Sequence, residues 1–242
     1  MKNVAAPLPE PESVSFASVR AAYDSGRVDL VCVLGPTASG KTRYAVELAR
    51  AIGGEIISAD SRQVYRGMDI GTGKDLAEYG DVPYHLIDIV PIGGKYNVAR
   101  FAEDFGKAAA DIRSRGAVPI LCGGTGLYIN AVTAGSYSFD GITKPLSESR
   151  DYSRTFFIGT LVDRQTRNER IDRRLDARLA EGMEDEIRGL LQSGADPQTL
   201  IAYGLEYKYV TEYVLGIIGR EQMRQQLATA IHRFAKRQMT WF

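Results

Sequence analysis

The sequence predicts an α/β fold, in which a mostly parallel sheet is covered by helices on both faces and is followed by a helical C-terminal part. Three observations support this prediction. Apolar runs of strand length alternate with helical periods over the first half of the chain, one strand-to-helix junction carries a glycine-rich loop, and helical periods fill the region after residue 163. In such sheets ligands gather beyond the carboxyl ends of the strands.

The first predicted elements surround the glycine-rich loop. The apolar run VDLVCVL, residues 28–34, predicts a buried strand that passes into GPTASGKT and then into the helical pattern RYAVELARAI. Gly53 and Gly54 end this helix. The runs EIISAD and HLIDIV predict the second and third strands, and a helix over NVARFAEDFGKAAADIRSRG leads into a fourth strand, AVPILC.

The second half of the chain begins with a break in this pattern. Residues 135–153 are rich in Gly, Ser and charge and have no sustained period, which predicts a loop. The run TFFIGTL then predicts another strand. Helical patterns follow at residues 163–181, 183–193 and 200–214, and in the final segment REQMRQQLATAIHRFAKRQMTWF.

The length of 242 residues suits one α/β domain with a small appendage. Residues 1–27 are predicted to be a flexible N-terminal arm, because the beginning of the chain is rich in proline and lacks the continuous apolar core of a secretory signal. The predicted domain is therefore 28–242, and its helical C-terminal region is 163–242.

The composition limits the possible partners and compartments. Lys plus Arg equals Asp plus Glu, at 30 each, so any basic surface for a nucleic acid must be local. Cys32 and Cys122 lie in apolar runs and are predicted to be small buried hydrophobes. No disulfide framework, zinc spacing or apolar stretch of membrane-spanning length occurs, so we expect a cytoplasmic protein that does not enter a membrane.

The loop GPTASGKT, residues 35–42, matches the eight-position phosphate-binding loop, with a strand before it and a helix after it as that motif requires. It predicts a P-loop NTPase-like sheet. Lys41 supplies a cation and Thr42 a hydroxyl for Mg²⁺, while backbone amides and the helix N-terminus face the phosphates. The predicted phosphate contacts of the loop are Gly35, Thr37, Ala38, Ser39, Gly40, Lys41 and Thr42. The alternative interpretation is a glycine loop that only turns the chain.

Two further polar turns follow predicted strands and should therefore lie at the same edge of the sheet. Asp60 begins the stretch DSRQVYRGMDIGTGK after the second strand, and its alternative role is a helix cap or turn former. Thr125 lies in GGTGLY after the fourth strand, where the alternative is a tight turn without chemistry. A nucleotide-dependent kinase or hydrolase is the general expectation for a phosphate loop.

Taken together, GPTASGKT, ADSRQVYRGMDIGTGK, PYHLIDIV, GGTGLYI and the terminal FAKRQMTWF resemble the tRNA dimethylallyltransferase family, also called tRNA isopentenyltransferases. The resemblance covers about residues 31–128 and resumes from about residue 156 to the C-terminus. It implies transfer of a dimethylallyl group from its diphosphate to the exocyclic N6 amine of an adenosine beside the anticodon of tRNA, with Mg²⁺ and release of pyrophosphate.

The resemblance also implies roles for particular residues. Asp60 would be the base that removes a proton from the adenine amine, and Thr125 would hold the reacting groups. Lys41 and Mg²⁺ on Thr42 would stabilise charge on the leaving pyrophosphate. The residues expected to contact the acceptor adenine beside Asp60 and Thr125 are Ser61, Arg62 and Gln63.

The arginine-rich segment after residue 163 has two possible interpretations, as a solvated helix or as part of the site. Its six arginines alternate with acidic residues, as on a solvated helix with paired charges. By the resemblance, however, Arg164 and Arg170 belong to a helix that closes over the donor, where a forked guanidinium suits diphosphate. Arg164 is therefore also a candidate catalytic residue.

The last predicted helix has a similar ambiguity. Arg233, Lys236 and Arg237 lie near Phe234 and Trp241, a combination that fits RNA binding, whereas the alternative is an ordinary packed terminal helix. We expect the anticodon arm of tRNA to contact the three basic residues, and we expect a monomer.

The sequence departs from the family in one main respect. Family members insert a helical segment after GGTGLYI that embraces the anticodon arm, and here only the short segment 135–153 occupies that place. The loss removes RNA-contacting surface and leaves the catalytic motifs. Three alternatives therefore stay open: transfer to free AMP, ADP or ATP, a catalytically silent nucleotide-binding module, and a small-molecule kinase.

Overall fold

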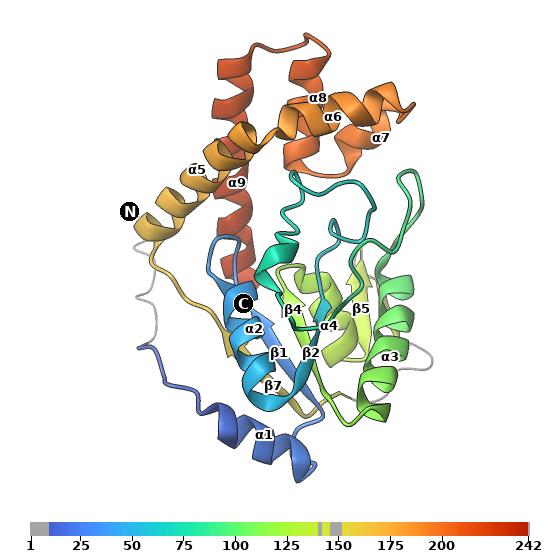
Figure 1. The fold of residues 1–242 in the computed structure, drawn as a ribbon, viewed down its shortest axis with the longest axis vertical. Helices are drawn as coiled ribbons and strands as arrows, with labels where there is room; N and C mark the ends of the chain where they lie inside the picture. The colour runs from blue at the N-terminus through green and yellow to red at the C-terminus, as the bar shows by residue number, and fades with distance from the viewer. Residues whose placement is uncertain (1–9, 140–141, 146–151, 242) are drawn as a thin grey trace.

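The computed structural model describes residues 10–139, 142–145 and 152–241. At its centre lies a five-stranded parallel sheet in the order β3-β2-β4-β1-β7 (Figure 1). The strands are β1 (Leu30–Leu34), β2 (Gly54–Ser58), β3 (Tyr84–His85), β4 (Val118–Gly123) and β7 (Thr155–Gly159). Parallel pairing places the carboxyl ends of all five at one edge, which confirms the predicted fold class.

Four helices cover the sheet: α1 (Phe16–Asp24), α2 (Lys41–Ile52), α3 (Val98–Ser114) and α4 (Gly126–Thr133). Val31 and Ile56 point to the face where α1 and α2 pack. Cys32 and Ile57, one residue further along each strand, point to the opposite face, where α3 and α4 pack. Because side chains alternate along a strand, a sheet buried on both faces needs the continuous apolar runs that the sequence shows.

Five helices follow the sheet: α5 (Arg164–Glu181), α6 (Met183–Gln192), α7 (Pro197–Ala202), α8 (Leu205–Val214) and α9 (Arg220–Trp241). They stack over the carboxyl ends of the strands, as Figure 1 shows. Leu175, Tyr207 and Leu227 from this layer form one core with Val64 and Met68 of the segment after β2. The predicted helical region is thus confirmed, and it forms the roof of the ligand edge.

The N-terminal arm predicted at residues 1–27 is wrong for its second half, which contains helix α1. Val19 is buried in the core, and the ring of Phe16 packs edge-on against Tyr44 with a centroid distance of 5.6 Å. Arg20 Nη1 donates a hydrogen bond to the carbonyl of Ile52 at 2.7 Å. The apolar residues of this short helix therefore find a partner in α2. Residues 1–9 lie outside the described part.

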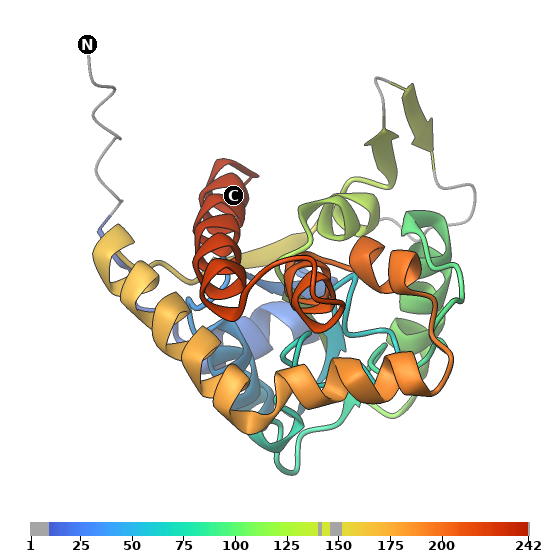
Figure 2. The same cartoon turned by 90° about the horizontal axis from the view of Figure 1, so that it is seen from above.

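The loop predicted at residues 135–153 is also wrong in part. Two antiparallel strands lie in it, β5 (Ser136–Phe139) and β6 (Ile142–Pro145). Figure 2 shows this hairpin projecting from the edge of the molecule away from α5. The overlooked signal is the dipeptide Asp-Gly between two runs with aromatic and β-branched residues, which is a strong hairpin pattern. Residues 146–151 lie outside the described part.

The third predicted strand, HLIDIV, is shorter than expected, since only Tyr84 and His85 pair with β2. Leu86 and Asp88 have positive φ angles of 62° and 58°, a conformation that ends a strand. The amides of Asp88 and Val90 instead donate to the carbonyls of Gln63 and Val64. Backbone pairing with the segment after β2 thus replaces the sheet ladder.

Two smaller expectations have clear outcomes. The helical pattern at 200–214 is split at Gly204, where φ is 147°, into the end of α7 and all of α8. Cys32 and Cys122 are buried as predicted, and burial raises the pKa of the Cys122 thiol to about 12. No described helix is both long enough and apolar enough to cross a membrane.

Candidate active site

A cavity of about 730 Å³ lies between the carboxyl edge of the sheet and the helical roof. This volume is within the usual range for small-ligand sites. Its floor comes from the loops after β1, β2 and β4, and its roof from α5, α8 and α9. Among the predicted site residues, the lining contains Thr37, Lys41, Thr42, Asp60, Ser61, Arg62, Gln63, Thr125 and Arg237.

The phosphate loop connects β1 to α2 at one end of this floor. Gly40 has a φ of 85° and caps α2 without a side-chain hydrogen bond, so the amides of the first helical turn can face an anion. Within the loop, the amides of Thr37 and Ser39 already donate to Gln238 and to the carbonyl of Pro36. The buried hydroxyl of Ser39 lies 2.7 Å from Thr160 Oγ1, and Thr160 Oγ1 also donates to the carbonyl of Leu34. A neighbouring strand end therefore fixes the loop in place.

Lys41 is the first residue of α2 and points into the cavity. Among the described residues, its Nζ has one hydrogen bond, a long one of 3.4 Å to the carbonyl of Pro36. Burial lowers the pKa of Lys41, and the nearby Cys122 and Asp60 partly oppose this shift. A desolvated ammonium with so weak a partner gains most from a bound anion.

The turns that carry Asp60 and Thr125 are locked together. The amide of Ser61 donates to Thr125 Oγ1 at 3.2 Å, and the amide of Thr125 donates to the carbonyl of Ala59 at 3.2 Å. Gly123 must be glycine, because a Cβ there would lie 2.3 Å from the oxygen of Ala59. Asp60 and Thr125 are thereby held together on the floor of the cavity.

Hydrogen bonds also fix the part of the cavity floor around Asp60. Asp60 Oδ1 accepts a hydrogen bond from the amide of Arg62 at 2.8 Å, which holds the carboxylate in an Asx-type turn. Gln63 accepts from Ser58 Oγ at 3.0 Å and donates to the carbonyl of Gly73 at 3.0 Å. The amide group of Gln63 thus links β2 to the segment that contains Gly73.

The helical roof supplies two arginines that the sequence did not single out. Arg174 and Arg178 line the cavity, and both pair with Asp75 Oδ2, at 2.8 Å and 3.2 Å. Burial lowers the pKa of Arg178, with the neighbouring Arg174 adding to the effect. Their spacing of four residues on one helix face is the signal that could have identified them. Arg164 and Arg170 are exposed and lie outside the lining.

Helix α9 contributes more to the cavity than its basic residues. Gln238, Phe234 and Trp241 line it together with Arg237, whereas Arg233 and Lys236 do not. The side chain of Gln238 accepts from the amide of Thr37 and donates to the carbonyl of Gly124. One carboxamide therefore joins the phosphate loop to the second glycine turn, a role that helical periodicity alone does not reveal.

A second carboxyl group, Glu206 of α8, faces the cavity from the roof. Burial raises its pKa, and the guanidinium groups of Arg178 and Arg174 partly counter this rise. No local pattern in the sequence identifies this residue, because its place in the cavity depends on how α8 packs over the sheet. The cavity thus holds Asp60 on its floor and Glu206 on its roof.

The cavity offers few protein ligands for a metal ion. Among the described residues no three His, Cys, Asp or Glu side chains converge to hold an ion. Thr42 lines the cavity beside Lys41 and can offer one hydroxyl. Mg²⁺ commonly takes one or two protein ligands and completes its shell with phosphate oxygens and water, so the residues present fit Mg²⁺ bound together with a diphosphate.

Comparison with known families settles the relationship of this chain. The IPP transferase family model matches residues 63–151 and 138–242, and the isopentenyl transferase model matches residues 28–79. The chain belongs to the tRNA dimethylallyltransferase family. The two IPP transferase segments overlap at residues 138–151, inside the segment 135–153 that the sequence predicts to be shortened relative to the family.

Curated relatives agree with this assignment to the tRNA dimethylallyltransferase family. The chain is 45% identical to tRNA dimethylallyltransferase 1 of Parabacteroides distasonis over 269 residues, covering 88% of each chain. It is also 45% identical to tRNA dimethylallyltransferase 1 of Porphyromonas gingivalis over 268 residues, which cover 88% of this chain and 89% of the relative.

Solved structures of the family share the fold. The tRNA isopentenylpyrophosphate transferase of Bacillus halodurans superposes with a TM-score of 0.77 at 33% identity, covering 88% of this chain and 86% of the other. The enzyme of Staphylococcus epidermidis gives 0.78 at 30% identity, covering 88% and 89%. A eukaryotic dimethylallyltransferase acting on tRNA gives 0.74 at 22% identity, covering 88% and 69%, which supports the fold alone.

Proposed function

We propose that the protein transfers a dimethylallyl group from dimethylallyl diphosphate to the N6 amine of an adenosine beside the anticodon in tRNA, and that pyrophosphate leaves. One observation carries the proposal. A single cavity contains a phosphate loop with an underpaired Lys41 and, on another part of its floor, the locked pair of Asp60 and Thr125. Family membership supplies the group transferred and the acceptor.

The donor end of the cavity stabilises negative charge. As the bond between the allylic carbon and the diphosphate oxygen breaks, charge grows on the leaving group. Loop amides and Lys41 would bind that charge, with Arg174 and Arg178 as the arginines that line the site. Contacts from Arg164 and Arg170 would require α5 to close over the donor. Thr42 and the phosphate oxygens would hold Mg²⁺, which would supply positive charge to the leaving diphosphate.

The acceptor end removes a proton. The exocyclic amine of adenine becomes acidic once it attacks the allylic carbon, so a carboxylate within reach must accept its proton. Asp60 is the proposed base, since the amide of Arg62 fixes its orientation and it lines the cavity floor with Thr125. Ser61, Arg62 and Gln63 would position the base, and Arg237 at the cavity rim would contact RNA together with Arg233 and Lys236. We further propose a monomer that acts in the cytoplasm.

The short segment at 135–153 favours one alternative acceptor. With less RNA-contacting surface, free AMP, ADP or ATP could enter the same cavity and present the same amine to Asp60. A catalytically silent nucleotide-binding module is the third possibility, although it leaves the connection between Ser61 and Thr125 without a purpose.

One assay separates these functions. The protein is incubated with dimethylallyl diphosphate, Mg²⁺ and either unmodified tRNA or free AMP, and the products are digested to nucleosides and analysed by mass spectrometry. We expect prenylated adenosine from tRNA. Prenylation of AMP alone would assign the alternative acceptor, and no product from either acceptor with folded protein would refute the proposed activity. ATP binding without any transfer would favour the silent module.

A further inference from the structure

Tyr79 is a cavity residue that none of the motifs described above contains. It follows the short 3₁₀ turn η1 (Leu76–Glu78) and is 3% exposed. Its ring belongs to the core beside α2, and the ring centroids of Tyr79 and Tyr84 are 4.8 Å apart, so the ring is held in place by its neighbours. Tyr79 also lines the cavity. The little surface that Tyr79 keeps accessible therefore faces the cavity.

The hydroxyl of Tyr79 differs from those of the two other tyrosines in the described lining. The hydroxyl of Tyr203 accepts a hydrogen bond from the amide of Gly93 at 2.7 Å. The hydroxyl of Tyr207 donates one to Glu186 at 2.5 Å. For the hydroxyl of Tyr79, the part of the chain that the structure describes offers no hydrogen-bond partner. Buried hydroxyls are normally hydrogen-bonded, because loss of hydration otherwise costs free energy, so this hydroxyl is available to a ligand in the cavity.

This hydroxyl lies at the end of the cavity that the phosphate loop forms. Tyr79 shares a core with α2, which begins with Lys41 and Thr42, and both of these residues line the cavity. Burial raises the pKa of Tyr79, and the neighbouring Cys122 and Asp60 add to the rise. The thiol of Cys122 in turn lies 3.9 Å from the carbonyl oxygen of Lys41. The hydroxyl therefore keeps its proton beside Lys41 and can act as a hydrogen-bond donor there.

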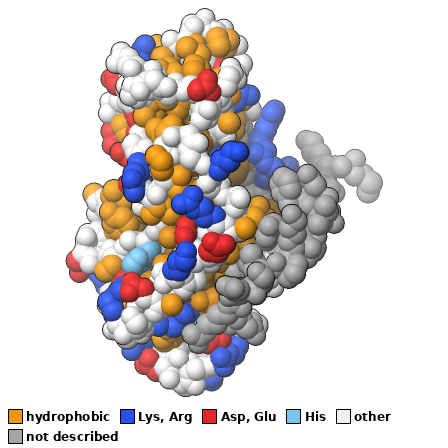
Figure 3. Space-filling model, turned by 90° about the vertical axis from the view of Figure 1, so that its right-hand side faces the viewer, with side chains coloured by type: hydrophobic (Ala, Val, Ile, Leu, Met, Phe, Trp, Pro, Cys, Tyr) orange, Lys and Arg blue, Asp and Glu red, His pale blue; other side chains and the backbone are white. Residues whose placement is uncertain are grey.

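The charge of the cavity favours an anion as the partner of this hydroxyl. On the face drawn in Figure 3, basic and acidic side chains are mixed, so that surface concentrates neither sign of charge. The described lining of the cavity has more basic than acidic side chains, namely Lys41, Arg62, Arg174, Arg178 and Arg237 against Asp60 and Glu206. Positive charge thus predominates inside the cavity, which suits a diphosphate. A hydroxyl also forms a stronger hydrogen bond with a charged acceptor than with a neutral one.

We propose that Tyr79 is a further catalytic residue, whose hydroxyl donates a hydrogen bond to the diphosphate of the donor next to the contact of Lys41. The inference rests on the proposed function, since it adds a contact to the same donor site. As the allylic bond breaks, negative charge grows on the diphosphate oxygens, and a hydrogen bond to them becomes stronger. The phenol retains its proton throughout, so the contact stabilises the departing pyrophosphate without a proton transfer.

The test uses the full chain and two matched deletions of a hydroxyl. Tyr79→Phe removes the hydroxyl and keeps the buried ring. Tyr84→Phe removes the hydroxyl of the other ring in the same aromatic pair, where the residue is 39% exposed and lies outside the cavity lining. Calorimetric titration with pyrophosphate and Mg²⁺, without RNA, gives the dissociation constant. Urea unfolding of the free protein and single-turnover transfer to tRNA complete the set of measurements.

For Tyr79→Phe we expect the dissociation constant of pyrophosphate to rise about tenfold or more and the transfer rate to fall by at least as much, with the KM for tRNA little changed. The free variant should be as stable as wild type, because no internal hydrogen bond is lost. Tyr84→Phe should behave as wild type. Equal pyrophosphate binding by the two variants would overturn the proposal, and so would a loss of stability in free Tyr79→Phe that accounts for the weaker binding. A wild-type protein that transfers nothing, with the difference in pyrophosphate binding preserved, would refute the proposed activity and support the contact.

Discussion

The side chain of Gln238, near the end of α9, accepts a hydrogen bond from the main-chain amide of Thr37 at 2.8 Å. The same carboxamide donates to the carbonyl of Gly124 at 2.9 Å, and Gln238 is buried. Residues about 200 positions apart in the chain therefore meet at the phosphate loop. The geometry of the loop at the proposed donor site therefore depends on the correct docking of the terminal helix.

Substitution of Gln238 by Ala should weaken donor binding as well as stability. It leaves the partly buried amide of Thr37 and the carbonyl of Gly124 without this partner, which costs about 1–3 kcal/mol of unfolding free energy. We expect the KM for dimethylallyl diphosphate to rise more than kcat falls. Urea unfolding and donor titration measure the two effects, with Gln192→Ala, an exposed change on α6, as the control. Unaltered donor affinity would show that the bridge does not shape the loop.

Removal of the Asp60 carboxylate should stop the chemistry and spare the donor. In Asp60→Ala the proposed proton acceptor is lost while the phosphate loop remains, so kcat should fall about 10²- to 10⁴-fold with nearly unchanged binding of dimethylallyl diphosphate. Single-turnover transfer and calorimetric donor titration separate the two quantities. Wild-type turnover in this variant would assign the base elsewhere, with Glu206 as the next carboxyl group in the cavity.

Lys41→Ala should impair both binding and turnover. The ammonium would contact the diphosphate before and after the bond breaks, so its loss should raise the donor dissociation constant and lower kcat together. The same calorimetric titration gives the dissociation constant. Lys41→Arg keeps the charge in a bulkier and differently shaped group, and we expect it to recover part of the binding only. A normal dissociation constant in Lys41→Ala would contradict the proposed contact.

Glu186 of α6 should prove essential for the segment that follows Met68. Its carboxylate accepts hydrogen bonds from the amides of Asp69, Ile70 and Gly71, and it also binds the hydroxyl of Tyr207 at 2.5 Å. Glu186→Ala should therefore lower the free energy of unfolding by about 1.5–3 kcal/mol, the range for hydrogen bonds to a charged group.

Tyr207→Phe is the matched control for that substitution, since it removes one of the four hydrogen bonds and should cost about 1 kcal/mol. Chemical denaturation of both variants measures the difference. Equal losses of unfolding free energy in the two variants would mean that the hydrogen bonds from the three backbone amides to the carboxylate do not stabilise the fold.

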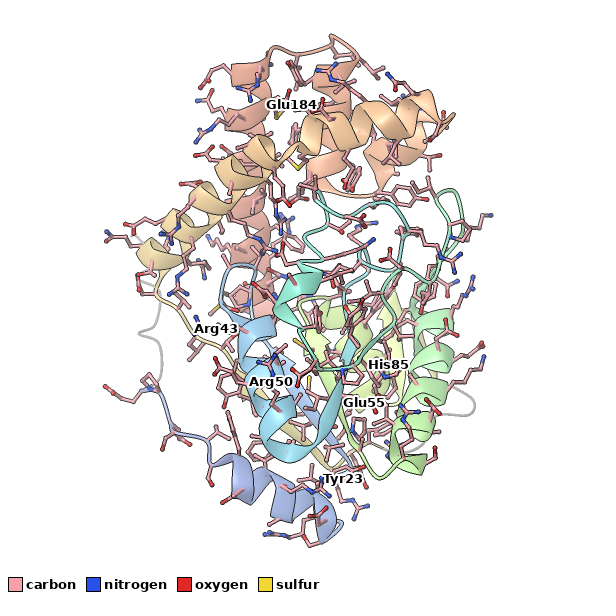
Figure 4. The ribbon with its side chains drawn as sticks, in the orientation of Figure 1. Tyr23, Arg43, Arg50, Glu55, His85 and Glu184 are labelled. Atoms are coloured by element: carbon pink, nitrogen blue, oxygen red, sulfur yellow. The ribbon has the colours of Figure 1, made fainter. Side chains whose placement is uncertain are left out.

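Glu55 of β2 should make stability depend on pH. His85 Nε2 lies 2.7 Å from Glu55 Oε2, Arg115 Nη2 lies 2.8 Å from it, and Figure 4 shows Glu55 beside His85. Burial alone would raise the pKa of Glu55, but hydrogen bonds from Arg115 and His85 outweigh it and the pKa is lowered. The stabilisation is therefore complete above the unfolded pKa, about 4.3, and disappears as pH falls through the folded value.

We accordingly expect Glu55→Gln to cost about 1–3 kcal/mol of unfolding free energy at pH 7 and progressively less below about pH 4. Urea unfolding at several pH values tests this. Asp111→Asn changes the exposed partner of the same Arg115 and should cost less than about 1 kcal/mol. A loss for Glu55→Gln that is independent of pH would rule out the charged pair as its origin.

Several features were determined by the sequence because their physics is local. The phosphate loop needs glycines, Lys41 and Thr42 at fixed spacing between a strand and a helix, and α5, α6 and α9 follow from helical periodicity. The order of the motifs was enough to indicate the family. Local patterns also placed Asp60 and Thr125 after neighbouring strands, at the edge where they meet.

Only the tertiary structure decided which side chains of the helical region reach the cavity. Periodicity defines the faces of α5, but the packing of α5 over the sheet selects Arg174 and Arg178 rather than Arg164 and Arg170. The contact of Gln238 with Thr37 joins segments that no local pattern connects. The physical reason is the same in each case: a sequence window fixes backbone conformation over a few residues, whereas site contacts depend on how distant elements dock.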